Sequence, residues 1–263
     1  MIRSIYNIER FPDGSPHITL KNVGDVYNKS GILWCYENME EFVLVAMIAN
    51  DLHKKYGIFP TLTMPYIPNA RMDRTENVYD VFSLKYFAEL LNSLPLSGVK
   101  VFDPHSFMSE ALIKNMVKIP VNDVLKLAVK RFKADVVFFP DAGAMKRYKD
   151  VLSSDNIPVI FGEKERDWNT GEIKGPKIHG DFEPGSRILM IDDICSYGGT
   201  LYHSALALKK MHDCSLGIYV SHCENSIFQG NLLDKNPDLI EHIYTTNSIY
   251  SGNHEKISIV KSF

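Results

Sequence analysis

The sequence has little cysteine and no long apolar run. Its four cysteines are Cys35, Cys195, Cys214 and Cys223. Their spacing matches no common zinc pattern and favours free thiols in a reducing cytoplasm over a disulfide framework. His212 and His222 lie close to two of these cysteines, but the apolar residues between them are typical of a buried strand, which argues against a metal site. No apolar run approaches the roughly 20 residues of a membrane helix, so we expect a cytoplasmic protein without a membrane partner.

An excess of basic charge is also missing. The 263 residues include 29 Lys and Arg against 32 Asp and Glu, and the formal net charge is -3. Because surfaces that bind nucleic acid are usually strongly basic, we expect no nucleic-acid partner. Hydrophobic residues make up 45% of the chain, which is enough for a large core or for two domains.

Predicted strands alternate with predicted helices along most of the chain. The strands are predicted at 31–36, 60–67, 98–104, 134–139, 157–164, 187–193 and 215–223, and the helices at 39–55, 82–94, 145–152 and 199–211. This order, with continuous Val, Ile and Phe runs, predicts parallel sheets with helices on both faces. The pattern restarts near residue 122, which predicts two domains, 1–122 and 123–263. The polar segment Glu163–His179 is the candidate for a mobile loop.

The stretch ILMIDDICSYGGTL, residues 188–201, joins an apolar strand to a helix that we expect to begin near Gly199. Its apolar part ends at Ile191. Glycines at such a turn let backbone N–H groups approach a phosphate, and the helix N-terminus favours negative charge. Asp192 and Asp193 suit sugar hydroxyls or a magnesium shell, so the stretch predicts a ribose phosphate site. The structural alternative is a helix cap and a tight turn.

Other polar groups follow predicted strands. Arg71 and Arg74 are spaced to clamp a triphosphate, because the planar guanidinium fork matches phosphate oxygens; the alternative is a surface ion pair with Asp73 or Glu76. His105 follows Asp103 at another strand end, where a functional and a structural role are both open.

Lys164 and Arg166 begin the long polar segment. Two cations there are either a solvated charge run or a lid that closes over a transferring phosphoryl group.

Together these motifs resemble the ribose-phosphate diphosphokinase (phosphoribosyl pyrophosphate synthetase) family. The segments that carry the resemblance are RFPDGSPHITL, MPYIPNARMDR, VFDPHS, FPDAGA, FGEKER and the stretch from 188 to 201, in the family's order. The resemblance implies an α/β fold with two doubly wound parallel-sheet domains of the type I phosphoribosyltransferase-like fold. The first three segments would be unexplained in a phosphoribosyltransferase.

The resemblance also implies a reaction. The β,γ-diphosphoryl group of ATP passes to the anomeric hydroxyl of a ribose 5-phosphate moiety, AMP leaves, and Mg²⁺ is the cofactor. The implied partners are ATP, the acceptor and further copies of the chain in a homo-oligomer.

The resemblance then assigns roles to individual residues. Lys164, Arg166 and His105 would be catalytic, and His105 and Asp141 would hold magnesium. ATP would be bound by Phe11, Asp13, Arg71, Arg74 and His105, with the adenine at Phe11 and Asp13. The acceptor would be bound by Asp192, Asp193, Ser196, Tyr197, Gly198, Gly199 and Thr200.

The chain departs from the family pattern at the acceptor. Ser196 and Tyr197 stand where an acid and a threonine are usual, and Met72 and Ser15 replace a glutamine and a glutamate. Tyr197 is bulky enough to reshape the phosphate pocket. The acceptor is therefore either ribose 5-phosphate or a 5-substituted ribose phosphate such as ADP-ribose, for which bacteriophage relatives include a diphosphokinase. The chain is also shorter than typical members, which leaves hexameric assembly and allosteric regulation open. The remaining alternatives are a catalytically silent nucleotide-binding relative and a type I phosphoribosyltransferase.

Overall fold

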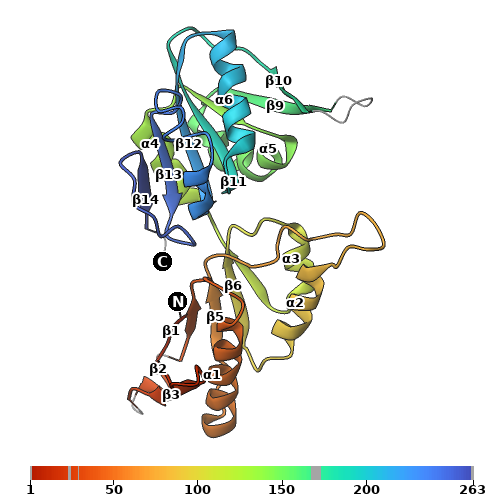
Figure 1. The fold of residues 1–263 in the computed structure, drawn as a ribbon, viewed down its shortest axis with the longest axis vertical. Coiled ribbons are helices and arrows are strands. Elements are labelled where there is room, and N and C mark those ends of the chain that lie inside the picture. Colours follow the sequence, from red (N-terminus) through yellow and green to blue (C-terminus); the bar gives the residue numbers. More distant parts are fainter. Residues whose placement is uncertain (1, 23–24, 29, 167–172, 262–263) are drawn as a thin grey trace. The chain divides into compact units, whose positions relative to one another are not determined.

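The computed structural model describes residues 2–22, 25–28, 30–166 and 173–261. Contacts between residues divide the chain into two compact units, Met1–Pro120 and Val121–Phe263, and each has its own hydrophobic core. Figure 1 shows the elements of both units. Each unit is described by itself below.

The first unit contains a five-stranded sheet in the order β1-β4-β5-β6-β7. Its strands are β1 (Ile2–Arg3), β4 (Ile32–Trp34), β5 (Thr61–Met64), β6 (Gly98–Phe102) and β7 (Met116–Ile119). Strands β4 to β7 are parallel, and β1 pairs with β4 in the antiparallel sense. The strands β2 (Tyr6–Arg10) and β3 (Pro16–Leu20) form a separate antiparallel hairpin. The helices are α1 (Glu41–Tyr56), α2 (Ser83–Asn92) and α3 (Phe107–Leu112).

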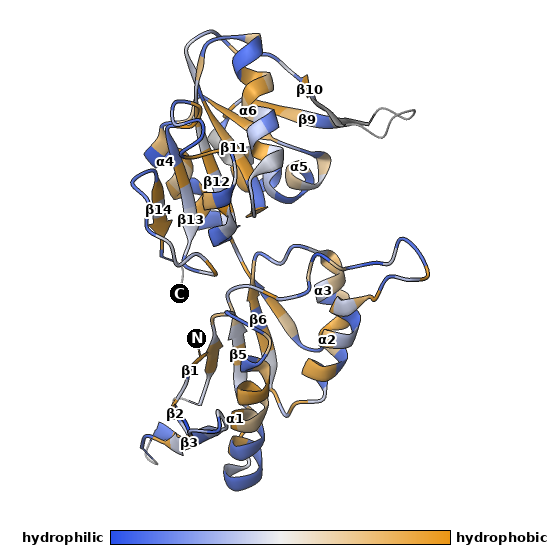
Figure 2. Cartoon of the chain, in the orientation of Figure 1, coloured by the Kyte–Doolittle hydropathy of each residue, from blue (hydrophilic) through white to orange (hydrophobic). Residues whose placement is uncertain are grey.

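Helix α1 shows how the sequence sets these elements. Apolar residues at helical spacing bury one side, and Trp34 Nε1 donates a hydrogen bond to the Glu41 carboxylate at 2.8 Å, which ties the helix start to β4. The last turn is basic and hydrophilic, as Figure 2 shows in blue. The helix ends at Gly57, whose positive φ of 69° is the usual left-handed helix end.

The second unit contains a seven-stranded sheet in the order β10-β9-β8-β11-β12-β13-β14. Its strands are β8 (Val136–Phe139), β9 (Val159–Arg166), β10 (Ile173–His179), β11 (Ser186–Cys195), β12 (Cys214–Cys223), β13 (His242–Thr246) and β14 (Ile257–Val260). All neighbours are parallel except β9 and β10. The helices are α4 (Asn122–Phe132), α5 (Ala142–Tyr148) and α6 (Gly199–Met211), with 3-10 helices at Lys149–Asp155 and Asn225–Gln229. The α/β fold with parallel sheets confirms the predicted fold class.

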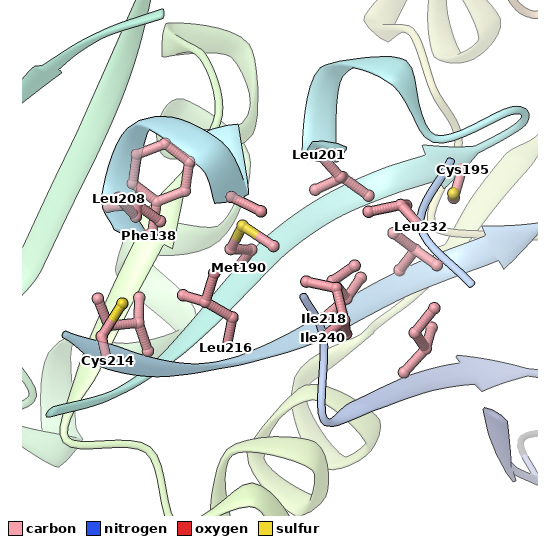
Figure 3. Packing of buried hydrophobic residues seen from close by; sticks show 14 of the residues in the cluster. Phe138, Met190, Cys195, Leu201, Leu208, Cys214, Leu216, Ile218, Leu232 and Ile240 are labelled. Carbon is pink, nitrogen blue, oxygen red and sulfur yellow. The ribbon is translucent and has the colours of Figure 1, made fainter. Parts of the chain in front are cut away.

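Packing in this unit places the start of α6 beside the strand ends. Leu201 and Leu208 lie on one side of α6 and belong to the same buried cluster as Met190 on β11 and Ile218 on β12 (Figure 3). The four residues Ile188–Ile191 are fully buried because β11 lies between β8 and β12 with a neighbour on each edge. A continuous apolar run is what such a central parallel strand requires.

Two predictions need correction. Strand β11 continues beyond the predicted end at Asp193 to Cys195, because Ile194 and Cys195 still pair with His222 and Cys223 of β12. The segment 163–179, predicted as a mobile loop, is largely an antiparallel pair: Lys177 lies opposite Glu163, and His179 lies opposite Phe161. The polar composition misled the prediction, since an edge strand that is only partly covered can also be polar. Residues 167–172, between the two strands, lie outside the described residues.

Within the described ranges, no helix is both long enough and apolar enough to cross a membrane.

Candidate active site

The turn from β11 into α6 is built for a close approach of backbone to a ligand. We call residues Cys195–Gly199 the acceptor loop. Gly198 caps α6 with φ 75°, and a Cβ atom there would lie 2.3 Å from Leu232 Cδ1, so any other residue would strain the backbone and displace Leu232. At Gly199 a Cβ would meet no atom within 4 Å, so the space beside it is open. The N–H groups in the first turn of a helix have no partner within the helix and favour an anion.

Two carboxylates lie on β11 just before this loop. The N–H of Asp193 donates to Asp192 Oδ1, and the N–H of Ile194 donates to Asp193 Oδ1, each at 2.9 Å. Arg147 on α5 forms an ion pair with the buried Asp193, with 3.1 Å between Nη1 and Oδ2. Arg147 was not predicted from the sequence as a site residue. It lies on α5, the helix that directly follows Asp141 at the end of β8.

Burial raises the pKa of Asp192 well above its usual value, and the neighbouring charges of Asp193 and Asp141 raise it further. Asp141 therefore belongs to the same group of carboxylates, at the end of the adjacent strand β8. It also caps α5, because its Oδ1 accepts a hydrogen bond from the N–H of Ala144 at 3.0 Å. The site concentrates negative charge that a cation or hydroxyl donors would stabilise.

The two residues that depart from the family pattern differ in their surroundings. Ser196 Oγ donates a hydrogen bond of 2.7 Å to Glu224 Oε2, at the end of β12. Tyr197 is 57% exposed. Its carbonyl oxygen lies so close to Gly230 that a Cβ there would clash with it. Glu224 was not predicted from the sequence, but its position directly after a buried strand is the signal that identified the other candidates.

Strand ends of the first unit carry the predicted ATP residues. Asp103 is buried with a left-handed φ of 40°, an uncommon conformation for a residue other than glycine. It precedes the partly buried His105. Ser106 Oγ donates to Asp73 Oδ2 at 2.6 Å, which joins the end of β6 to the exposed arginines Arg71 and Arg74.

Phe11 and Asp13 lie in the turn of the β2–β3 hairpin. The Phe11 ring is half exposed and lies 5.1 Å from the His17 ring, measured between centroids. Asp13 accepts hydrogen bonds from the side chain of Ser15 at 2.6 Å and from its N–H at 3.0 Å, and these lower the pKa of Asp13. Ser15, one of the departures, thus fixes the predicted adenine ligand.

Lys164 and Arg166 are alternate residues of β9, and their backbones pair with Pro176 and Ile173 of β10. Their side chains lie outside the described residues. Among the residues that are described, no group of three or more His, Cys, Asp or Glu side chains is arranged to hold a metal ion.

A solved structure has the same fold as this chain. The phosphoribosylpyrophosphate synthetase of Mycobacterium smegmatis matches 98% of this chain and 86% of its own, with a TM-score of 0.75 and 16% identity. The fold of the chain is therefore that of the phosphoribosylpyrophosphate synthetases.

Sequence comparisons point the same way. The ribose-phosphate pyrophosphokinase of Sulfurisphaera tokodaii is 26% identical over 95% of this chain and 86% of its own length. The ribose-phosphate pyrophosphokinase of Pyrococcus furiosus is 23% identical, over 96% of this chain and 88% of its own length. No family model matches the chain. The chain is a relative of the ribose-phosphate pyrophosphokinases, and it is an enzyme of this transferase type.

Proposed function

We propose that the protein transfers the β,γ-diphosphoryl group of ATP to the anomeric hydroxyl of a ribose 5-phosphate moiety and releases AMP. The observation that carries this proposal is the Asp192–Asp193 pair directly before the acceptor loop, in a chain whose relatives are named ribose-phosphate pyrophosphokinases. The carboxylates suit the sugar hydroxyls, and the glycine turn suits the 5-phosphate. The carboxylates and the glycine turn would thus bind different parts of the same ligand, its sugar and its phosphate.

The carboxylates at the ends of β8 and β11 concentrate negative charge that a magnesium ion would neutralise, although no three described His, Cys, Asp or Glu side chains are arranged as a ready metal site. Asp141 and Asp193 raise the pKa of Asp192, so a divalent cation would stabilise the ionised forms. By the resemblance alone, we propose Asp141 of the second unit and His105 of the first unit as magnesium ligands, each considered within its own unit. When bound, the ion would neutralise charge on the phosphate oxygens of ATP.

The rest of the catalytic work is alignment and charge stabilisation. We assign the triphosphate to Arg71 and Arg74, and the adenine to Phe11 and Asp13. Phosphoryl transfer needs little covalent chemistry from the protein, since its transition state carries charge mainly on the phosphoryl oxygens. Lys164 and Arg166, with His105, would stabilise that charge.

The acceptor has two candidates. Ribose 5-phosphate is the acceptor implied by the names of the relatives. A 5-substituted ribose phosphate such as ADP-ribose is favoured by Tyr197, which is exposed at the loop and offers a ring on which an attached group can stack. We also infer a homo-oligomer in the cytoplasm, by the resemblance alone.

The test is an AMP-release assay with ATP and Mg²⁺ against each acceptor. Acceptor-dependent AMP release with a diphosphorylated sugar product supports the proposal. ATP binding without AMP release for any acceptor would instead indicate a silent relative, and diphosphate release that depends on a nucleobase would indicate a phosphoribosyltransferase.

A further inference from the structure

The carboxylate of Glu224 connects the end of β12 to the acceptor loop. Its Oε2 atom accepts hydrogen bonds from Ser196 Oγ at 2.7 Å and from Ser226 Oγ at 3.2 Å. The two hydroxyl oxygens are 3.1 Å apart. The N–H of Glu224 also donates to the carbonyl oxygen of Cys195 at 2.8 Å. The side chain of Glu224 therefore binds Ser196, and its backbone binds Cys195, the residue before it in the acceptor loop.

The segment after Glu224 supports the loop further along. Gly230 lies against the carbonyl oxygen of Tyr197, and Leu232 fills the space beside Gly198. Leu232 is fully buried and belongs to the same cluster as Leu201 and Cys195, which Figure 3 shows beside it. Residues 224–232 thus form a rigid support under the loop, and Glu224 is the part of the support that carries charge.

We propose that Glu224 is a positioning residue for acceptor binding. Its carboxylate fixes the Ser196 hydroxyl and the conformation of the acceptor loop, so that the backbone of the loop is already arranged for the phosphate. Hydrogen bonds to a charged group are worth about 1.5–3 kcal/mol, enough to hold a short loop in one conformation. This role depends on the proposed function, because it assumes that the loop binds a ribose phosphate.

Kinetics of Glu224→Ala and Glu224→Gln test the role. With alanine, KM for the acceptor should rise on the order of tenfold, as expected for loss of one such interaction, while KM for ATP stays within about twofold. Glutamine should restore most of the affinity, since its side-chain oxygen can accept from both serines. Glu241→Ala is the matched control: Glu241 pairs with Arg187 at 2.8 Å on the segment before β13 and should leave both KM values unchanged.

Ser196→Ala provides a second route to the same interaction if Glu224→Ala does not fold. It removes the same hydrogen bond from the other side and should raise the acceptor KM by a similar factor; where Glu224→Ala folds, the two effects should not add, because both changes act on one hydrogen bond. An unchanged acceptor KM in folded Glu224→Ala, an equal rise in both KM values, or full additivity would overturn the proposal. A glutamine variant as weak as the alanine variant would also overturn it.

Calorimetric titration with ribose 5-phosphate and with ADP-ribose separates this proposal from the proposed reaction. If the wild-type protein binds an acceptor but releases no AMP, the reaction is wrong, and the affinities of the variants still decide the role of Glu224. If the wild-type protein binds neither acceptor, both proposals fail.

Discussion

Arg147 and Asp193 join helix α5 to the end of β11 through an ion pair of 3.1 Å. Asp193 is buried and Arg147 is only 20% exposed at its side chain, so little water remains to solvate either charge. Removing Arg147 takes a cation away from the buried Asp193 carboxylate.

Arg147→Met should therefore destabilise the protein by about 3 kcal/mol, the usual cost of breaking a buried pair from one side. Denaturant unfolding of the variant measures this. Arg131→Met, at an exposed position of α4, is the control and should change stability by less than about 0.5 kcal/mol. Equal stability of the two variants would show that the pair contributes nothing.

Asp192→Asn should make the protein more stable at neutral pH while it weakens acceptor binding. The raised pKa of Asp192 means that the folded state holds the proton more tightly than the unfolded chain does. Its contribution to stability is therefore fully present below the ordinary pKa of 3.8 and is lost as the pH rises through the raised value.

In a metal-free buffer with a chelator, Tm of Asp192→Asn should exceed that of the wild type by a few degrees at pH 7, and the gap should close near pH 4. Asp150→Asn, at an exposed position, is the control. A gap that does not depend on pH would contradict the explanation.

Gly198→Ala should be far more damaging than Gly185→Ala. Both glycines have a positive φ, 75° and 87°, but a Cβ at Gly185 would meet no atom within 4 Å, whereas one at Gly198 would clash with Leu232. The Gly185 variant measures the backbone cost alone, about 1 kcal/mol. Unfolding experiments should show at least about 2 kcal/mol more for Gly198. Similar losses in the two variants would mean that Leu232 moves aside.

Tyr197→Thr should leave stability unchanged, since the ring is largely exposed. If the ring contacts a group attached to the 5-phosphate, the ratio of kcat/KM for ADP-ribose to that for ribose 5-phosphate should fall about tenfold, the value of one stacking contact. Tyr86→Thr, similarly exposed on α2, is the control. An unchanged ratio would show that Tyr197 does not affect the choice between the two acceptors.

Lys164→Ala and Arg166→Ala should each lower turnover on the order of 10³-fold, with a smaller effect on ATP binding, by analogy with arginine fingers. Lys177→Ala, an exposed lysine on the paired strand β10, is the control and should keep near wild-type turnover. Near wild-type turnover in both test variants would exclude their catalytic role.

The sequence predicts the parallel α/β class well, because buried parallel strands such as Ile188–Ile191 require continuous apolar runs. It also predicts the start of α6 at Gly199, since the two glycines mark the turn. The continuation of β11 beyond Asp193 to Cys195 is not predictable from local pattern, because it depends on pairing with β12. The same holds for β10 and the last two residues of β9, whose polar sequence does not predict the antiparallel pair that they form.

In the candidate site, too, some residues can be predicted from the sequence and others only from the folded structure. Residues that stand directly after apolar runs, such as Asp193 and His105, can be found from the sequence. The partners Arg147 and Glu224 come from other elements, and only the folded sheet brings them to Asp193 and Ser196. Local pattern therefore identifies the candidate ligand-binding residues more readily than the residues that contact them.

The edge strand β10 contains Pro176, and its register with β9 is irregular between Ile173 and Pro176. Proline has no N–H to donate, and an irregular edge twists away from a flat partner. The outer side of this hairpin is therefore poorly suited to accept a strand from another molecule, so the exposed edge of the seven-stranded sheet is protected from edge-to-edge aggregation where β10 ends it.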